Sequence, residues 1–217
     1  MLFDIDGTLV DSNYLHVHAW TRAFAEEGIP VEAWRIHRCI GMDGTQLLQS
    51  LSGDADEDAQ KRVKDRHLRY LKESAPLLRR LPGARELLEQ IRSRGLQVVL
   101  ASSSSEEELA LSLPVLDCDD LVAATTSSKD VDVAKPEPTI IEVALDRAGV
   151  DADRAVYVGD AVWDIVACGR AGVRAIGLLS GGVSAAELEK AGAEAVFENP
   201  GDLADHLDDT SVAALTA

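Results

Sequence analysis

Two aspartates, Asp4 and Asp6, flank a single residue at the end of a short apolar run, and Gly7 and Thr8 follow them directly. In an extended chain, side chains two residues apart point to the same side, with their Cα atoms roughly 7 Å apart. This spacing leaves room for one carboxylate to attack phosphorus while the other handles a proton. The stretch "DIDGT" therefore predicts either a turn or a reactive site, and the rest of the sequence must decide between them.

The elements that must position these residues can be read from the hydrophobic pattern. Residues 12–80 repeat apolar side chains at helical spacing, whereas short apolar runs such as "LQVVLAS" and "AVYVGD" alternate with helical stretches further on. Strands that alternate with helices are typical of βαβ units in a parallel sheet. We therefore expect an α/β protein in which residues 1–11 and 81–217 form the sheet and its helices, and residues 12–80 form an all-helical insert. Because Asp4 comes so early, the first strand is expected to be short.

Polar clusters follow four strands of the predicted sheet. The first is "DIDGT", and the later ones contain Ser102 and Ser103, then Lys135, then Asp160 and Asp164. Functional residues of parallel α/β sheets gather beyond the carboxyl ends of the strands, so we expect all four clusters at one edge. Together they suit phosphoryl transfer. The Ser102 hydroxyl and amides at a helix start can bind phosphate oxygens, Lys135 can neutralise charge, and Asp160 with the first aspartate can hold Mg²⁺.

The composition limits the class of protein and its partners. The chain has 217 residues and a formal charge of −17, from 21 basic and 38 acidic residues. This charge argues against nucleic acid and against an anionic membrane as partners. An anionic substrate then needs a local positive potential, which Mg²⁺, Lys135 and backbone dipoles would supply. Three scattered cysteines, with neither a signal-like start nor an apolar run of membrane-spanning length, predict a cytoplasmic protein.

In this order and approximate spacing, the four clusters resemble the motifs of the haloacid dehalogenase-like hydrolases, in the branch with a helical cap inserted after the first motif. "DIDGT" matches the first motif, Ser102 the second, Lys135 the third and "GDAVWD" the fourth. The resemblance covers nearly the whole chain, and the combination of four motifs is specific although each one alone is weak. It implies a Rossmann-like parallel sheet with the active site between the core and the cap.

The resemblance also implies a role for each matching position in the hydrolysis of a small phosphomonoester, of the phosphoglycolate or sugar-phosphate class. Asp4 would be the nucleophile that forms an aspartyl-phosphate, and Asp6 would be the general acid for the leaving alkoxide and then the base for water. Mg²⁺ would be held by the Asp4 carboxylate, the Asp6 backbone carbonyl and Asp160, with Asp164 either a further ligand or a partner of a ligand. The residues expected to bind substrate or phosphate are Gly7, Thr8, Ser102, Ser103, Lys135 and His16.

Other reactions of the family make different demands on the sequence. Dehalogenases attack carbon and need neither a metal nor a second aspartate of this kind, so Asp6 counts against them. Phosphonatases use a cap lysine, and residues 12–57 contain none. β-Phosphoglucomutases have a similar opening stretch that includes His16, but Gly44 and Gly159 stand where they carry an arginine and a glutamate. We therefore expect hydrolysis, with a phosphosugar mutase or a catalytically silent binding protein as the alternatives.

Several conspicuous side chains have no role that the sequence alone decides. Position in the predicted cap does not decide whether His16 or Arg38 contacts the substrate. Trp20, Trp34 and Trp163 are expected to be packing residues. The implied partner is a small phosphorylated metabolite, and the chain is expected to be a monomer or a homodimer.

Overall fold

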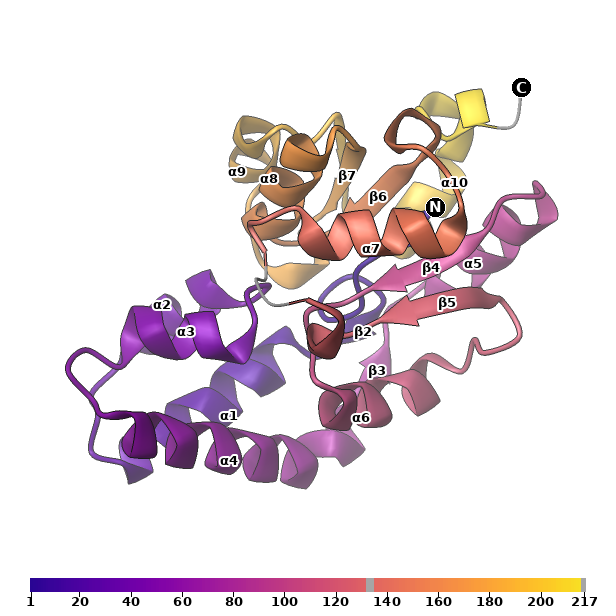
Figure 1. The fold of residues 1–217 in the computed structure, drawn as a ribbon. Helices are drawn as coiled ribbons and strands as arrows, with labels where there is room; N and C mark the ends of the chain where they lie inside the picture. The colour runs from indigo at the N-terminus through magenta and orange to yellow at the C-terminus, as the bar shows by residue number, and fades with distance from the viewer. Residues whose placement is uncertain (132–134, 216–217) are drawn as a thin grey trace.

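The computed structural model describes residues 1–131 and 135–215. A six-stranded sheet forms its centre, in the order β5-β4-β1-β6-β7-β8 (Figure 1). All neighbouring strands of this sheet run parallel. The strands are β1 (Leu2–Phe3), β4 (Val98–Ala101), β5 (Val122–Thr126), β6 (Val156–Gly159), β7 (Arg174–Leu178) and β8 (Ala195–Phe197). The predicted parallel α/β sheet is confirmed.

Helices cover both faces of the sheet, so the core has three layers (Figure 1). One face carries α5 (Ala84–Ser93), α6 (Glu106–Leu116) and α10 (Pro200–Asp205), and the other carries α7 (Thr139–Ala148), α8 (Val162–Ala171) and α9 (Ala185–Ala191). Successive strand residues divide between the two faces, because side chains alternate along a strand. Phe3 and Val158 belong to the first apolar core, whereas Leu2 and Tyr157 belong to the second. Among the described residues, no helix is both long and apolar enough to cross a membrane.

Four helices lie between β2 (Val10–Asp11) and β3 (Arg79–Arg80), and we call them the helical insert. They are α1 (Asn13–Glu26), α2 (Ala33–Cys39), α3 (Gly44–Leu51) and α4 (Glu57–Ser74). The insert encloses a third apolar core, which includes Trp20 and Phe24. Strands β2 and β3 pair antiparallel, so the chain enters and leaves the insert at one place. The helical character of this segment is confirmed, and its division as a separate domain at residues 12–80 stays a prediction.

The three tryptophans differ in their burial. Trp20 is buried in the core of the insert, and the Trp163 indole N–H donates to the Arg38 backbone carbonyl at 2.9 Å. Trp34 is 67% exposed, so its predicted packing role is wrong. The reason is helical geometry, since α2 buries Ile36 and so turns Trp34, two residues away, to the opposite face.

Strand β1 is short, as expected, yet it lies at the centre of the sheet. It pairs with β4 on one side and β6 on the other. The ammonium group of Met1 donates to the Gln97 carbonyl at 2.7 Å, and the Asp4 N–H donates to the Val158 carbonyl at 2.9 Å. Both ends of the strand are therefore fixed by hydrogen bonds, and the backbone position of Asp4 is set by its neighbour β6.

Candidate active site

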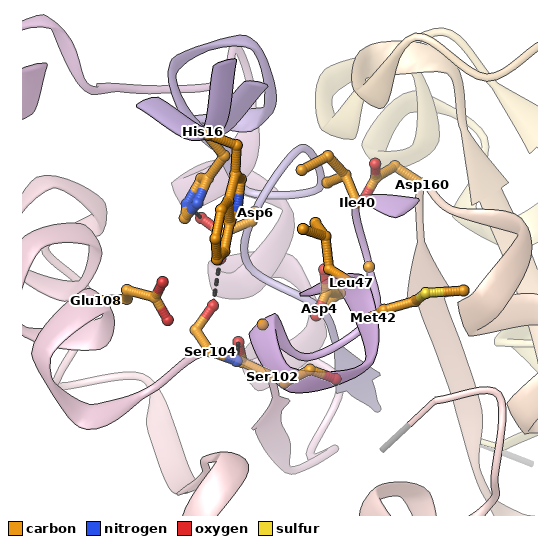
Figure 2. A pocket seen from close by; sticks show the side chains of 14 residues that line it. Asp4, Asp6, His16, Ile40, Met42, Leu47, Ser102, Ser104, Glu108 and Asp160 are labelled. Atoms are coloured by element: carbon orange, nitrogen blue, oxygen red, sulfur yellow. Dashed lines mark hydrogen bonds and ion pairs between the residues drawn. The ribbon is translucent and has the colours of Figure 1, made fainter. Parts of the chain in front are cut away.

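The four predicted clusters meet at the carboxyl edge of the sheet. Asp4 and Asp6 lie in the loop after β1, the serines follow β4, and Asp160 and Asp164 follow β6. Lys135 reaches the same edge from the segment before α7, and its side chain is fully buried. Figure 2 shows how several of these side chains surround one cavity. The parallel topology explains this meeting, because it brings the ends of strands distant in sequence to one place.

Lys135 lies at the centre of a buried polar cluster. Its Nζ is 3.0 Å from Asp4 Oδ1 and 2.7 Å from Asp164 Oδ1. It also donates to the Tyr157 hydroxyl at 2.8 Å and to the Ala101 carbonyl at 3.2 Å. Burial alone would lower the pKa of Lys135, but the Asp164 and Asp4 carboxylates outweigh burial and raise that pKa above its ordinary value. The lysine therefore stays charged and holds one oxygen of Asp4.

Asp4 combines deep burial with an ion pair. Its side chain borders the cavity although the residue is only 5% exposed. Burial raises the pKa of Asp4 to about 7, against the attraction of Lys135, and repulsion from Asp164 and Asp6 acts in the same direction as burial. A second cation beside Asp4 would favour its ionised form, which is the form that can attack an electrophile.

Asp160 is fixed by donors from the first loop and from α1. The Thr8 hydroxyl donates to Asp160 Oδ1 at 2.8 Å, and the Asn13 amide donates to Oδ2 at 2.8 Å. Gly7, at φ +72°, permits this packing, because a Cβ there would lie 2.3 Å from Asn13 Nδ2 and 2.5 Å from Asp160 Oδ2. Gly7 and Thr8 thus support Asp160 in this structure, and their contact with phosphate stays a prediction.

A divalent cation fits the acidic cluster. Asp4, Asp160 and Asp164 are buried, and each offers a carboxylate oxygen within 4.8 Å of the others. Burial, with repulsion from Asp164 and Asp4, raises the pKa of Asp160 well above its ordinary value. Buried oxygen donors with excess negative charge suit Mg²⁺. Asp164 already accepts hydrogen bonds from Lys135 and, at 3.0 Å, from the Ala161 N–H. These contacts favour Asp164 as the residue that positions Lys135 over a role as a direct metal ligand.

Asp6 is surrounded by donors instead of a lysine. It accepts from the Ser12 hydroxyl at 2.5 Å and from the Ser104 hydroxyl at 2.7 Å, and His16 Nε2 lies 3.5 Å from Asp6 Oδ1. Burial raises the pKa of Asp6, but the charge of His16 and these hydrogen bonds outweigh burial and place that pKa well below its ordinary value. The environment thus shifts the pKa values of the two carboxylates of "DIDGT" in opposite directions, upward for Asp4 and downward for Asp6.

The serines after β4 approach the site in different ways. Ser102 is buried and accepts from the Ser104 N–H at 3.1 Å. Ser103 borders the cavity, and its hydroxyl oxygen is buried without a hydrogen-bond partner in the part of the chain that the structure describes. A buried hydroxyl without a partner costs roughly 1–3 kcal/mol. The Ser103 hydroxyl is therefore available to an oxygen atom of a ligand.

Residues of the helical insert form one wall of the site. The inner cavity over Asp4 and Asp6 measures about 50 Å³, and an outer cavity of about 590 Å³ lies beside it. Trp20, Gly44 and Glu108 border both cavities. His16 borders the inner cavity, whereas Arg38 lies outside these two linings and pairs with Glu187 at 2.5 Å. A ligand could thus extend from the inner cavity into the outer one.

Five residues of this site were not among those predicted from the sequence: Asn13, His67, Ser104, Glu108 and Tyr157. Ser104 belongs to the run "SSSS", so its place in that run was a usable signal. Tyr157 reads as one more core residue of an apolar strand, and Asn13 reads as a residue of a helix start. Nothing in the local sequence distinguishes His67 and Glu108 from other residues on the polar face of a helix.

The fold and the site define a class of protein, namely hydrolases with an acidic active site at the carboxyl edge of a parallel sheet and a helical insert above it. The chain belongs to the haloacid dehalogenase-like hydrolases, because the family model of that description matches residues 1–178. The resemblance carried by the four motifs is thereby confirmed.

Two named enzymes and one solved structure are similar to the chain over most of its length. A phosphoglycolate phosphatase from Rhodospirillum rubrum is 30% identical over 225 residues, covering 95% of this chain and 90% of the relative. A phosphorylated carbohydrates phosphatase from Thermotoga maritima is 29% identical, covering 81% and 82%. The crystal structure of a hydrolase from Pseudomonas syringae superposes with a TM-score of 0.92 at 38% identity, covering 96% and 97% of the two chains.

Proposed function

We propose that the chain hydrolyses small phosphomonoesters through an aspartyl-phosphate formed on Asp4, with Mg²⁺ bound. One observation carries the proposal: the buried Asp4 carboxylate borders a cavity, is paired with the buried Lys135, and lies two residues from Asp6. The names of the similar proteins from R. rubrum and T. maritima, both phosphatases, support the same reaction.

The side chains divide the reaction between them. Asp4 attacks phosphorus and forms a bond to it, while the bond from phosphorus to the leaving oxygen breaks. Lys135 offsets charge on Asp4 and on the phosphoryl group, and the Ser103 hydroxyl donates to a phosphoryl oxygen. Asp6 is ionised in the resting site, because His16 and two serine hydroxyls hold its pKa below the ordinary value. It first takes up a proton from the monoanionic form of the bound ester, gives that proton to the leaving alkoxide, and then takes one from the water that opens the aspartyl-phosphate. The products are an alcohol and inorganic phosphate.

The metal, the cap and the compartment belong to the same proposal. Mg²⁺, held by the Asp4 carboxylate, the Asp6 backbone carbonyl and Asp160, would neutralise the charge of the phosphoryl group. Residues 12–80 would act as a cap domain that closes over the substrate. We place the enzyme in the cytoplasm, where its three free and buried cysteines would stay reduced.

The charges around the inner cavity favour a neutral leaving group. Its lining has four carboxylates, those of Asp4, Asp6, Glu108 and Asp160, against the single imidazole of His16, and among the described residues that line it none is a lysine or an arginine. A carboxylate on the leaving group, placed about 5 Å from Glu108 at an effective dielectric constant of about 20, meets a repulsion of about 3 kcal/mol. The outer cavity, which includes Thr45, Gln49 and Lys64, has polar groups for hydroxyls. This favours a sugar or polyol phosphate over phosphoglycolate.

The nucleophile is tested by replacing Asp4 with asparagine. We expect Asp4→Asn to abolish hydrolysis of an aryl phosphate in the presence of Mg²⁺, and Asp54→Asn, at an exposed position of the insert, to leave it unchanged. EDTA should remove the activity of the wild type, and added Mg²⁺ should restore it. Phosphate release by Asp4→Asn at more than about 1% of the wild-type rate would show that Asp4 is not the nucleophile.

The leaving group is tested with two substrates of nearly equal size. Phosphoglycolate and 2-hydroxyethyl phosphate differ in a carboxylate against a hydroxymethyl group. The estimated repulsion predicts a kcat/KM about 100-fold higher for 2-hydroxyethyl phosphate, and Glu108→Gln should narrow that ratio. Equal or faster turnover of phosphoglycolate would refute the preference for neutral leaving groups and leave the reaction itself in place.

A further inference from the structure

A line of side chains leads away from Asp6 on the side opposite to the nucleophile. His16 Nε2 lies 3.5 Å from Asp6 Oδ1. The other ring nitrogen of His16, Nδ1, lies 3.2 Å from His67 Nε2. His67 Nδ1 in turn lies 3.6 Å from Glu108 Oε1. His67 is 2% exposed, and the proposed reaction gives it no task.

The two imidazole rings meet edge to edge. Their centroids are 5.3 Å apart and their planes differ by 29°, which brings the facing nitrogens to hydrogen-bond distance close to the ring planes. The other contact of His67 is of a different kind. Trp20 stacks on its face, with centroids 3.8 Å apart and planes within 9°. Trp20 therefore holds the plane of the His67 ring, and His16 meets the edge of that ring.

One arrangement of protons suits every contact in the line. Asp6 accepts hydrogen bonds from two serine hydroxyls, so it faces His16 as an acceptor and His16 Nε2 carries a proton. If His16 Nδ1 is also protonated, it donates to His67 Nε2, and the remaining proton of His67 on Nδ1 points to Glu108. The opposite tautomer of His67 would turn a lone pair toward the Glu108 carboxylate, which is unfavourable.

The line connects the helical insert with the core at both ends. His16 lies on α1 and His67 on α4, both in the insert, whereas Asp6 and Glu108 belong to the core. Glu108 is itself fixed, because the Ser105 N–H donates to its Oε2 at 2.7 Å in the capping box of α6. His67 thus meets a carboxylate whose place is already set when the insert lies on the core (Figure 2 shows Asp6, His16 and Glu108).

We propose that His67 is a positioning residue: held between Glu108 and His16, it fixes the His16 ring against Asp6 when the helical insert is closed on the core. This inference rests on the proposed function in one respect, since it takes Asp6 as the group that transfers protons. It has a mechanistic consequence. Opening of the insert separates His67 from Glu108 and His16 from Asp6, so the alignment of Asp6 depends on closure over a substrate.

The arrangement of protons can be measured in the wild-type protein without any activity. In ¹⁵N-detected NMR spectra of the histidine side chains at pH 7, we expect His67 to be the neutral Nδ1–H tautomer. Assignment uses His67→Gln and His16→Gln. A neutral Nε2–H tautomer at His67 would overturn the inference, whether or not a phosphatase substrate has been found.

The positioning role is tested by comparing three variants. His67→Ala should lower kcat by about 10–100-fold, the range found when a metal-binding histidine loses its hydrogen-bond partner. The change in KM should be smaller, and the His16 NMR signals should shift. His67→Gln keeps one acceptor and one donor side by side and should recover most of kcat. His18→Ala, at an exposed site on the same helix, is the control and should match the wild type. A kcat for His67→Ala within twofold of the wild type, or unchanged His16 signals, would refute the role.

Discussion

Replacement of Tyr157 by phenylalanine tests the polar cluster around Lys135 through a single oxygen atom. The hydroxyl accepts from Lys135 Nζ at 2.8 Å and lies 3.2 Å from both Asp164 Oδ1 and the Ala101 carbonyl. Its one proton can serve one of these two acceptors at a time, so two hydrogen bonds are lost, and at least one of them involves a charged partner. A hydrogen bond to a charged group contributes about 1.5–3 kcal/mol.

The structure places the expected loss at about 1.5–3 kcal/mol in total rather than twice that value. Lys135 keeps three acceptors for its three N–H groups, namely Asp4, Asp164 and the Ala101 carbonyl, so no buried charge is left without a partner. In a chain of this size, the loss corresponds to a decrease in Tm of about 3–12 °C. Because Asp4 and Lys135 stay paired, the enzymatic activity should change far less than the stability.

The assay is thermal unfolding followed by circular dichroism, with Tyr70→Phe as the matched control. Tyr70 also has a buried ring, but its hydroxyl bonds Glu26, whose carboxylate is exposed to solvent. Exposed polar contacts contribute about 0–1 kcal/mol, so the control should lose less than Tyr157→Phe. Equal shifts in the two variants, or a Tyr157→Phe protein as stable as the wild type, would show that the Tyr157 hydroxyl does not stabilise the cluster around Lys135.

Three further predictions concern buried groups of the core. Gly181→Ala should lower both Mg²⁺ affinity and kcat, because a Cβ at that position would lie 1.7 Å from Asp160 Oδ2 and displace that carboxylate. Gly169→Ala is the control: no atom lies within 4 Å of its Cβ, so this variant should keep both properties. Its free energy of unfolding should rise by up to about 1 kcal/mol, because alanine favours a helix more than glycine does. Lys135→Met should abolish phosphate release and cost about 3–5 kcal/mol in urea unfolding, because it leaves buried carboxylates unpaired. Cys118, whose pKa burial raises to about 11, should react slowly with iodoacetamide at pH 8 and faster as the pH rises toward 11; fast labelling of the folded protein at pH 8 would contradict this.

Much of the site was predictable because its main groups follow strands directly in the sequence. Asp4 and Asp160 each come just after a buried apolar run, and parallel strands end at a common edge, so local patterns were enough to bring them together. Lys135 could be assigned to the site because it lies between the second and fourth motifs in the chain, where the third motif is expected. The layered sheet and the helical character of the insert likewise follow from periodicity in short windows.

The contacts that orient these groups could not be predicted, because they depend on side-chain direction between distant elements. Asn13 and Asp160 are 147 positions apart in the chain, and His67 is 51 positions from His16. Thr8 looked like a phosphate ligand in a turn, yet its hydroxyl donates to Asp160. Such pairings are decided by how distant elements pack on one another, within the insert, within the core and between the two. A single sequence does not contain that geometry in any local form.

The central strand β1 leaves the ribosome before the other five strands of its sheet. Its partners in β4 and β6 include residues 99–100 and 157–158. At a synthesis rate of roughly 5–20 residues per second, β6 follows β1 by roughly 8–30 s. The insert, which has an apolar core of its own, is complete long before β1 has both neighbours. A nascent chain released before β6 would thus carry both aspartates of "DIDGT" and still lack the strand that aligns them. Catalysis is therefore acquired only when β6 has been made, although the nucleophile precedes both partner strands in the chain.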